Sequence, residues 1–140
     1  HTGIHSFPTR RSSDLVQKIK LAAPAGSWTS ENRYGFAISH YKVGTALLAL
    51  GKVDGALAEF RAGLAIADEL YRKSPEITKH ADVRSDLMLS LAKAGAPEIT
   101  WQEVADFLAG MLKRGTAEPG KDKDYAFARQ KAEAEARSRK

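Results

Sequence analysis

The sequence predicts an all-α protein built from antiparallel helix-turn-helix hairpins, and three observations lead to this class. Between residues 40 and 75, apolar residues recur every three or four positions in two runs, as on the faces of two amphipathic helices. A short turn at residues 51–54 separates the runs and forces the two helices to lie antiparallel. A third run follows a helix-start pattern at residues 100–103. The runs consist of Val43, Leu47 and Leu50; of Val53, Leu57, Phe60, Leu64, Ala67 and Leu70; and of Trp101, Val104, Ala105, Leu108, Met111 and Leu112.

The first fifteen residues, HTGIHSFPTRRSSDL, differ in character from the rest of the chain. They show no helical or strand period and match neither a signal peptide nor a polyhistidine tag. The segment from Phe7 to Leu15 resembles the translation of a common sequencing adapter. We therefore expect residues 1–15 to be a sequencing artefact joined to a truncated gene. The alternative is a disordered basic arm at the N-terminus.

The net charge of +5 is concentrated near the C-terminus. Residues 16–112 hold eleven basic and eleven acidic side chains, whereas residues 113–140 hold nine basic and five acidic ones. The basic character therefore belongs to the tail and not to the predicted core. The chain has no cysteine, which excludes disulfides and thiolate metal sites and fits a cytoplasmic location. No apolar run approaches the roughly 18 residues that span a bilayer, so no membrane partner is expected.

The central hairpin at residues 40–75 has the features that its turn and its packing require. Gly51 tolerates the positive φ that ends a helix, and Asp54 is placed to cap the free amides of the next helix. Gly44, Ala56 and Gly63 are expected where the two backbones come close. A hairpin of this kind could also belong to an unrelated helical bundle.

Small residues and one aromatic residue in this window resemble the tetratricopeptide repeat (TPR) family. The matching positions are Gly44, Gly51, Ala56, Phe60 and Gly63. The resemblance implies a TPR-like α-solenoid fragment that acts as a protein-interaction module near the C-terminus of a larger protein.

A shift of 51 residues pairs Gly44 with Gly95 and predicts that the hairpin recurs. Residues 16–23 then form the end of a preceding unit, and residues 82–95 form the first helix of a following one. Residues 16–112 would hold one complete and two partial repeats. The offset exceeds the usual repeat of about 34 residues, which is similar to TPR variants with longer helices and a Pro-containing loop, here residues 74–81.

The last part of the chain departs from the repeat. Thr100 and Glu103 form a capping box that opens a helix over residues 101–113, which Gly115 ends. A polar linker and a charged helix then fill residues 113–140. This helix lacks a wide apolar face, so we expect only its first turn to dock and the part beyond Ala132 to fray.

The sequence contains no signature of an enzyme. It has no glycine-rich phosphate loop, nucleophile elbow or kinase motif. Neither His40 nor His80 has a second ligand at metal-binding spacing, and His40 is expected to be a partly buried packing residue. The carboxylates Glu59 and Asp68 are assigned to an exposed helix surface. We therefore predict no catalytic residue, no metal site and no cofactor.

The TPR resemblance implies a binding groove lined by the first helices of successive units. Carried onto this chain, the groove residues are Tyr41, Lys42, Thr45, Leu48, Leu89 and Lys93. Two lysines are too few for the TPR clamp that binds C-terminal carboxylates, so an extended or helical peptide is the expected ligand. The partner would be a protein, a peptide or another domain of the same full-length chain. The alternative is a helical protein that binds nucleic acid through its basic tail, which acidic residues within the tail disfavour.

Overall fold

The computed structural model describes residues 29–139, and these residues form five helices and no strand. The predicted all-α class is therefore confirmed for this part of the chain. The helices are α2 (Ser30–Ala49), α3 (Val53–Lys73), α4 (Thr78–Lys93), α5 (Trp101–Arg114) and α6 (Lys121–Ser138). The expected adapter-derived segment 1–15 and the expected partial helix at residues 16–23 lie outside the described residues.

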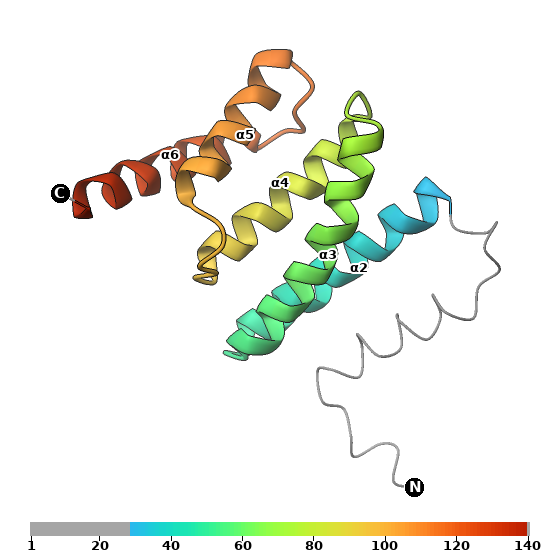
Figure 1. Ribbon diagram of the computed structural model, residues 1–140, viewed down its shortest axis with the longest axis horizontal. Coiled ribbons are helices and arrows are strands. Elements are labelled where there is room, and N and C mark those ends of the chain that lie inside the picture. The colour runs from blue at the N-terminus through green and yellow to red at the C-terminus, as the bar shows by residue number, and fades with distance from the viewer. Residues whose placement is uncertain (1–28, 140) are drawn as a thin grey trace, which may run out of the picture.

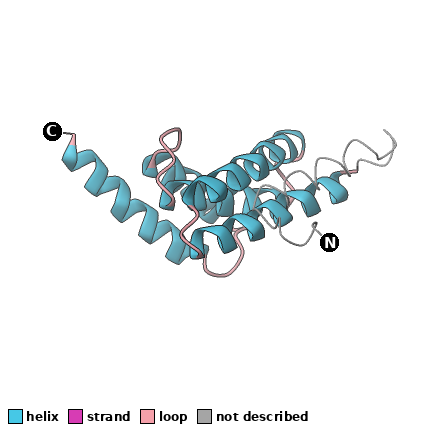
Figure 2. Cartoon of the chain, turned by 90° about the horizontal axis from the view of Figure 1, so that it is seen from below, coloured by secondary structure: helices cyan, strands magenta, loops and turns pink. Residues whose placement is uncertain are grey.

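Helices α2 and α3 form the predicted antiparallel hairpin, and α4 and α5 form a second one (Figure 1). Helix α4 contacts α3 and also α2, so the two hairpins stack through neighbouring helices. Helix α6 lies against α5, and its C-terminal end projects beyond the other helices (Figures 1 and 2). The segment between α3 and α4 is shorter than the expected loop at residues 74–81, because α4 already begins at Thr78.

The turns after α2 and α4 have the same construction. Gly51 and Gly95 follow these helices with φ angles of 76° and 85°. In each turn, the amides of the glycine and of the next residue donate hydrogen bonds to carbonyls three and five residues earlier, which is a Schellman motif. The structural counterpart of Gly95 is therefore Gly51, 44 residues earlier. The predicted 51-residue register is wrong, because its partner Gly44 lies buried in the middle of α2.

The entry into α3 differs from the prediction. Lys52 is the N-cap residue and makes no side-chain capping hydrogen bond, so Asp54 lies within the first turn and does not cap the helix. Leu50 and Val53 flank the Gly51 turn and are 69% and 41% exposed, because the helices end before they can cover these side chains. By contrast, the capping box of Thr100 and Glu103 and the left-handed Gly115 after α5 are both as predicted.

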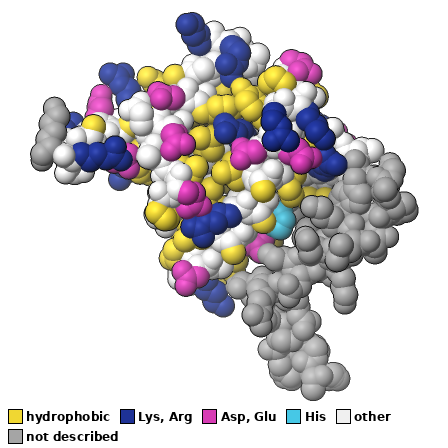
Figure 3. Space-filling view, in the orientation of Figure 1, with side chains coloured by type: hydrophobic (Ala, Val, Ile, Leu, Met, Phe, Trp, Pro, Cys, Tyr) yellow, Lys and Arg dark blue, Asp and Glu magenta, His cyan; other side chains and the backbone are white. Residues whose placement is uncertain are grey.

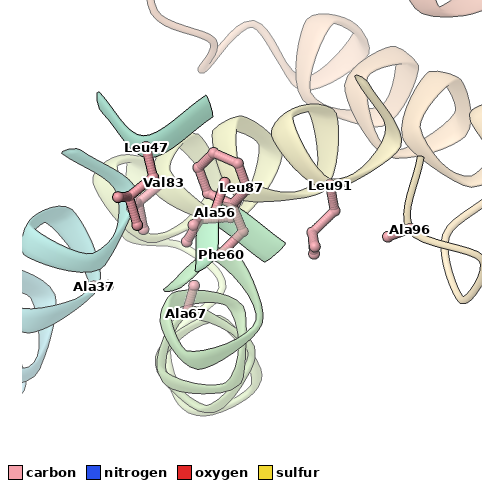
Figure 4. Packing of buried hydrophobic residues seen from close by; sticks show 9 residues of the cluster. All are labelled: Ala37, Leu47, Ala56, Phe60, Ala67, Val83, Leu87, Leu91 and Ala96. Carbon is pink, nitrogen blue, oxygen red and sulfur yellow. The ribbon is translucent and has the colours of Figure 1, made fainter. Parts of the chain in front are cut away.

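The core of the first hairpin is organised around Phe60, which is only 1% exposed. Its ring lies over Gly44: a Cβ atom built on that glycine would come within 2.5 Å of the ring. Gly63 plays a similar part, because a Cβ atom there would lie 2.9 Å from Leu87 of α4 and 3.4 Å from the Ala37 carbonyl of α2. The small residues therefore admit an aromatic ring and allow close helix packing. Figure 4 shows Phe60 among its buried neighbours.

The second hairpin has its own core, which α6 completes. Helix α6 contributes Ala128 to this cluster, which also contains Leu89, Val104, Leu108 and Met111, and Ala132 one turn later is buried as well. Near its C-terminal end, Glu135 accepts a hydrogen bond of 3.3 Å from the backbone amide of Trp101, the first residue of α5. The expectation that α6 docks only by its first turn and frays beyond Ala132 is therefore wrong. Small side chains allow a polar helix to approach closely without a wide apolar face.

Candidate interaction surface

Four of the predicted groove residues lie on α2, but they differ in accessibility. Lys42 and Thr45 are exposed, and the Thr45 hydroxyl donates a hydrogen bond of 2.9 Å to the Tyr41 carbonyl. Tyr41 and Leu48 are half-buried and pack against the core of the first hairpin. The Tyr41 ring lies 6.4 Å from the ring of Phe60. Only Lys42 and Thr45 can therefore be altered without disturbing the core.

The two predicted groove residues on α4 differ in accessibility, and the prediction that Leu89 lines an open groove is wrong. Leu89 is buried in the second core and is covered by residues of this same chain. Lys93 is exposed, and its Nζ lies 5.2 Å from the centre of the Phe127 ring on α6. Asp86 lies on the same side of α4, seven residues or about two turns before Lys93. Burial and then the charge of Asp86 raise the pKa of Tyr41.

A buried lysine that the sequence analysis did not single out joins α6 to α4. The side chain of Lys121, 6% exposed, donates hydrogen bonds to Ser85 Oγ at 2.9 Å and to Asp86 Oδ1 at 2.6 Å. Its ammonium also lies 3.5 Å from the Asp82 carbonyl. These acceptors satisfy an ammonium group that would be costly to bury alone. The sequence showed Lys121 only as one basic residue of the tail.

Asp82 lies beside this lysine and is poorly satisfied. Its Oδ1 accepts a long hydrogen bond of 3.5 Å from the Glu118 amide, and its buried Oδ2 has no hydrogen-bond partner. Burial raises the pKa of Asp82 to about 6, although the Glu118 amide and Lys121 both act in the opposite direction. The fold therefore favours the protonated carboxyl group.

This raised pKa predicts that stability falls with increasing pH. The folded protein binds the Asp82 proton more tightly than the unfolded chain does. The contribution of this proton to the free energy of unfolding is therefore complete below about pH 4 and is lost as the pH rises through about 6. The neutral variant Asp82→Asn should therefore gain up to about 3 kcal/mol relative to the wild type between pH 4 and pH 8. Urea denaturation at several pH values measures this difference. A difference that stays constant with pH would contradict the prediction.

Phe127 provides the most exposed aromatic ring on α6, with 38% of the residue accessible. Trp101 packs edge-on against it at 5.5 Å between ring centres. Lys131 also approaches the ring, with its Nζ 5.6 Å from the centre. The sequence indicated Phe127 only as a possible docking residue of the first turn, and its meeting with Lys93 depends on how α4 and α6 pack.

A buried hydrogen bond between His40 and Glu59 connects α2 and α3. Glu59, only 2% exposed, places its Oε1 2.8 Å from Nδ1 of His40. The assignment of Glu59 to an exposed surface is therefore wrong, whereas the prediction that His40 is a packing residue is confirmed. Asp68 is half-exposed but forms an ion pair with Arg84 of α4 at 2.7 Å, so its position is also not free.

Figure 3 shows the face that carries α3 and α5, where hydrophobic side chains gather between these two helices. Aromatic side chains of α3 and α5 contact each other here. Tyr71 and Phe107 meet edge-to-face at 5.2 Å, and the Arg84 guanidinium lies over both rings. The Arg84 side chain is in turn paired with Asp68. These aromatic and charged groups of α3, α4 and α5 are therefore already engaged with one another.

Residues 29–139 contain no group of three His, Asp or Glu side chains that could hold a metal ion. In this same part of the chain, no helix combines the length and the apolar character needed to cross a bilayer. His80 is buried with an unsatisfied Nδ1 beside the Tyr34 ring, and no acid or base partner is within hydrogen-bonding distance of that atom.

Comparison with protein-family models, with curated proteins and with solved structures found no match for this chain.

Proposed function

We propose that this chain is a TPR-like α-solenoid fragment that serves as a protein-interaction scaffold. The observation that carries the proposal is the repetition of a helical hairpin with the same glycine-terminated first helix. Helices α2 and α4 end in matching Schellman turns and contact each other, as successive units of an array do. Stacked repeats of this kind commonly expose an extended surface for a partner.

The proposed binding surface consists of three exposed side chains, Lys42 and Thr45 of α2 and Lys93 of α4. Neither lysine forms an ion pair within residues 29–139, so each ammonium is free to meet a ligand. The half-buried Tyr41 and Leu48 supply apolar area beside them. The ligand would be a peptide or helix of a protein partner, or of another domain of the full-length chain.

The alternative of nucleic-acid binding through the tail draws less support from α6. Lys121 is buried, and Arg129 and Arg139 form ion pairs one turn away with Glu133 and Glu135. Binding to a phosphate backbone depends on a track of available positive charge. These pairs interrupt such a track.

Replacing both Lys42 and Thr45 with glutamate should abolish partner capture while leaving the fold intact. Both side chains are exposed, and exposed substitutions usually change stability by less than about 0.5 kcal/mol. The two carboxylates would have to be desolvated in the contact. Capture from a lysate, with circular dichroism of each variant, measures the effect. A photo-crosslinking residue at position 45 should attach to the captured protein.

The matched control places the same charge change at the N-cap of α3 and within α3, by Lys52→Glu together with Ala58→Glu. Both positions are exposed, and neither lies on α2 or α4. This variant should retain the partner, and a crosslinker at position 58 should not react with it. If the control loses the partner while the α2 variant keeps it, the proposed surface is wrong.

A further inference from the structure

The surface around Phe127 combines an exposed aromatic ring with positive charge. Phe127 is 38% exposed, and its ring packs edge-on against Trp101, so it presents apolar surface at a defined place beside α5. Large apolar side chains are otherwise highly exposed in the described residues only at Leu50 and Val53, beside the α2–α3 turn. An exposed aromatic ring is a favourable anchor point for an apolar side chain of a ligand.

Two ammonium groups from different helices flank this ring. Lys93 of α4 and Lys131 of α6 place their Nζ atoms 5.2 Å and 5.6 Å from the ring centre. Within residues 29–139, neither lysine is engaged in an ion pair. The contact with the ring holds each ammonium near this apolar surface but does not neutralise its charge. A carboxylate bound at either lysine would therefore lie next to a side chain that packs on the ring.

We infer that Phe127, Lys93 and Lys131 form a docking site for an acidic peptide segment in which an aromatic or aliphatic residue is flanked by Asp or Glu. The inference rests on the proposed interaction function, because Lys93 belongs to the proposed binding surface. In such a complex, the apolar residue of the peptide would pack on the ring, and its carboxylates would bind the two ammonium groups.

The surrounding charges favour an acidic peptide over single-stranded nucleic acid. A base could stack on Phe127, but the phosphate backbone on both sides would need a continuous basic groove. Here Glu133 and Glu135 occupy the turn that follows Lys131, and each forms an ion pair with an arginine of α6. These pairs leave no continuous track of unpaired positive charge along α6 beyond Lys131, which a phosphate backbone needs on both sides of the ring. Two lysines alone match the short charge pattern of a peptide.

The inference is tested with labelled peptides made of repeated Glu-Phe-Glu triplets and the full 140-residue chain. Fluorescence anisotropy should show binding of this peptide but not of peptides made of Lys-Phe-Lys or Glu-Ser-Glu triplets, nor comparable binding of oligothymidine. Replacing Lys93 and Lys131 together with glutamine should weaken binding about tenfold, as two exposed charge contacts allow. Phe127→Ser should cause a similar loss.

The matched control is Lys113→Gln together with Lys123→Gln, which removes the same charge from exposed positions on α5 and α6 and should leave binding unchanged. The inference is overturned if the Glu-Phe-Glu peptide does not bind, if the control variant loses as much affinity as the Lys93 and Lys131 variant, or if oligothymidine binds as tightly. Any of these results, together with lysate capture that still depends on Lys42 and Thr45, would refute the acidic site and leave the proposed function standing. Loss of that dependence would refute the proposed function itself.

Discussion

Replacing Phe60 with alanine should leave the protein largely unfolded at room temperature. The ring is almost fully buried between α2 and α3 and packs directly over Gly44, which has no side chain. Removing a buried phenylalanine ring costs about 3 to 5 kcal/mol, whereas typical domains have a net stability of about 5 to 15 kcal/mol. An array of so few repeats should have a net stability near the lower end of this range. Circular dichroism and urea denaturation measure the loss.

Phe127→Ala is the matched control, because it removes the same group from a site that is 38% exposed. It leaves no closed cavity, so its cost should be clearly smaller than that of Phe60→Ala. A cooperative Phe60→Ala protein with nearly the stability of the wild type would show that the ring does not organise this core.

The second large effect is expected at Glu59. Replacing it with lysine would place a cation beside His40 in a site where the glutamate is only 2% exposed. Leaving the buried His40 nitrogen without its hydrogen-bond partner costs about 1 to 3 kcal/mol, and burying the new unpaired charge adds a larger penalty. We therefore expect Glu59→Lys to unfold, as judged by circular dichroism and by loss of a cooperative urea transition.

Asp54→Lys provides the comparison, because it makes the same charge change at an exposed position of α3. Asp54 lies in the first turn, so the change should cost only about 0.3 to 1 kcal/mol through the helix dipole. If the two variants were equally stable, Glu59 would have to be accessible to water, in conflict with its placement between α2 and α3.

Local sequence patterns were sufficient for α3 and α5 and for the turns after α2 and α5, but not for the start of α4, which lies at Thr78 and not at residue 82. The period of apolar residues predicted α3 and α5, and the position of Phe60 in the core followed from the same period. Gly51 and Gly115 adopt the left-handed conformation that was expected after a helix. These features depend on interactions within a few residues, which is why the sequence alone is informative about them.

The register of the repeat was harder to obtain from the sequence. Residue matches at a spacing of 51 paired Gly95 with Gly44, although the two glycines have different roles: one ends a helix, and the other accommodates the Phe60 ring. Glycine is used both where φ is positive and where another group comes close, and one sequence cannot distinguish these uses. The hydrogen bonds after α2 and α4 identify Gly51 as the true counterpart.

By itself the sequence determined the helical class, the central hairpin, the capping box of α5 and the absence of enzyme motifs. Only the tertiary structure decided which polar residues are buried, how α6 docks and which groups surround Phe127. Glu59 and Lys121 resemble solvated residues in a linear reading, yet each is satisfied by a partner on another helix. The meeting of Lys93 with Phe127 likewise requires α4 and α6 to lie side by side. Helix formation is governed by neighbours along the chain, whereas the burial and pairing of charges are governed by residues distant in sequence that packing brings together.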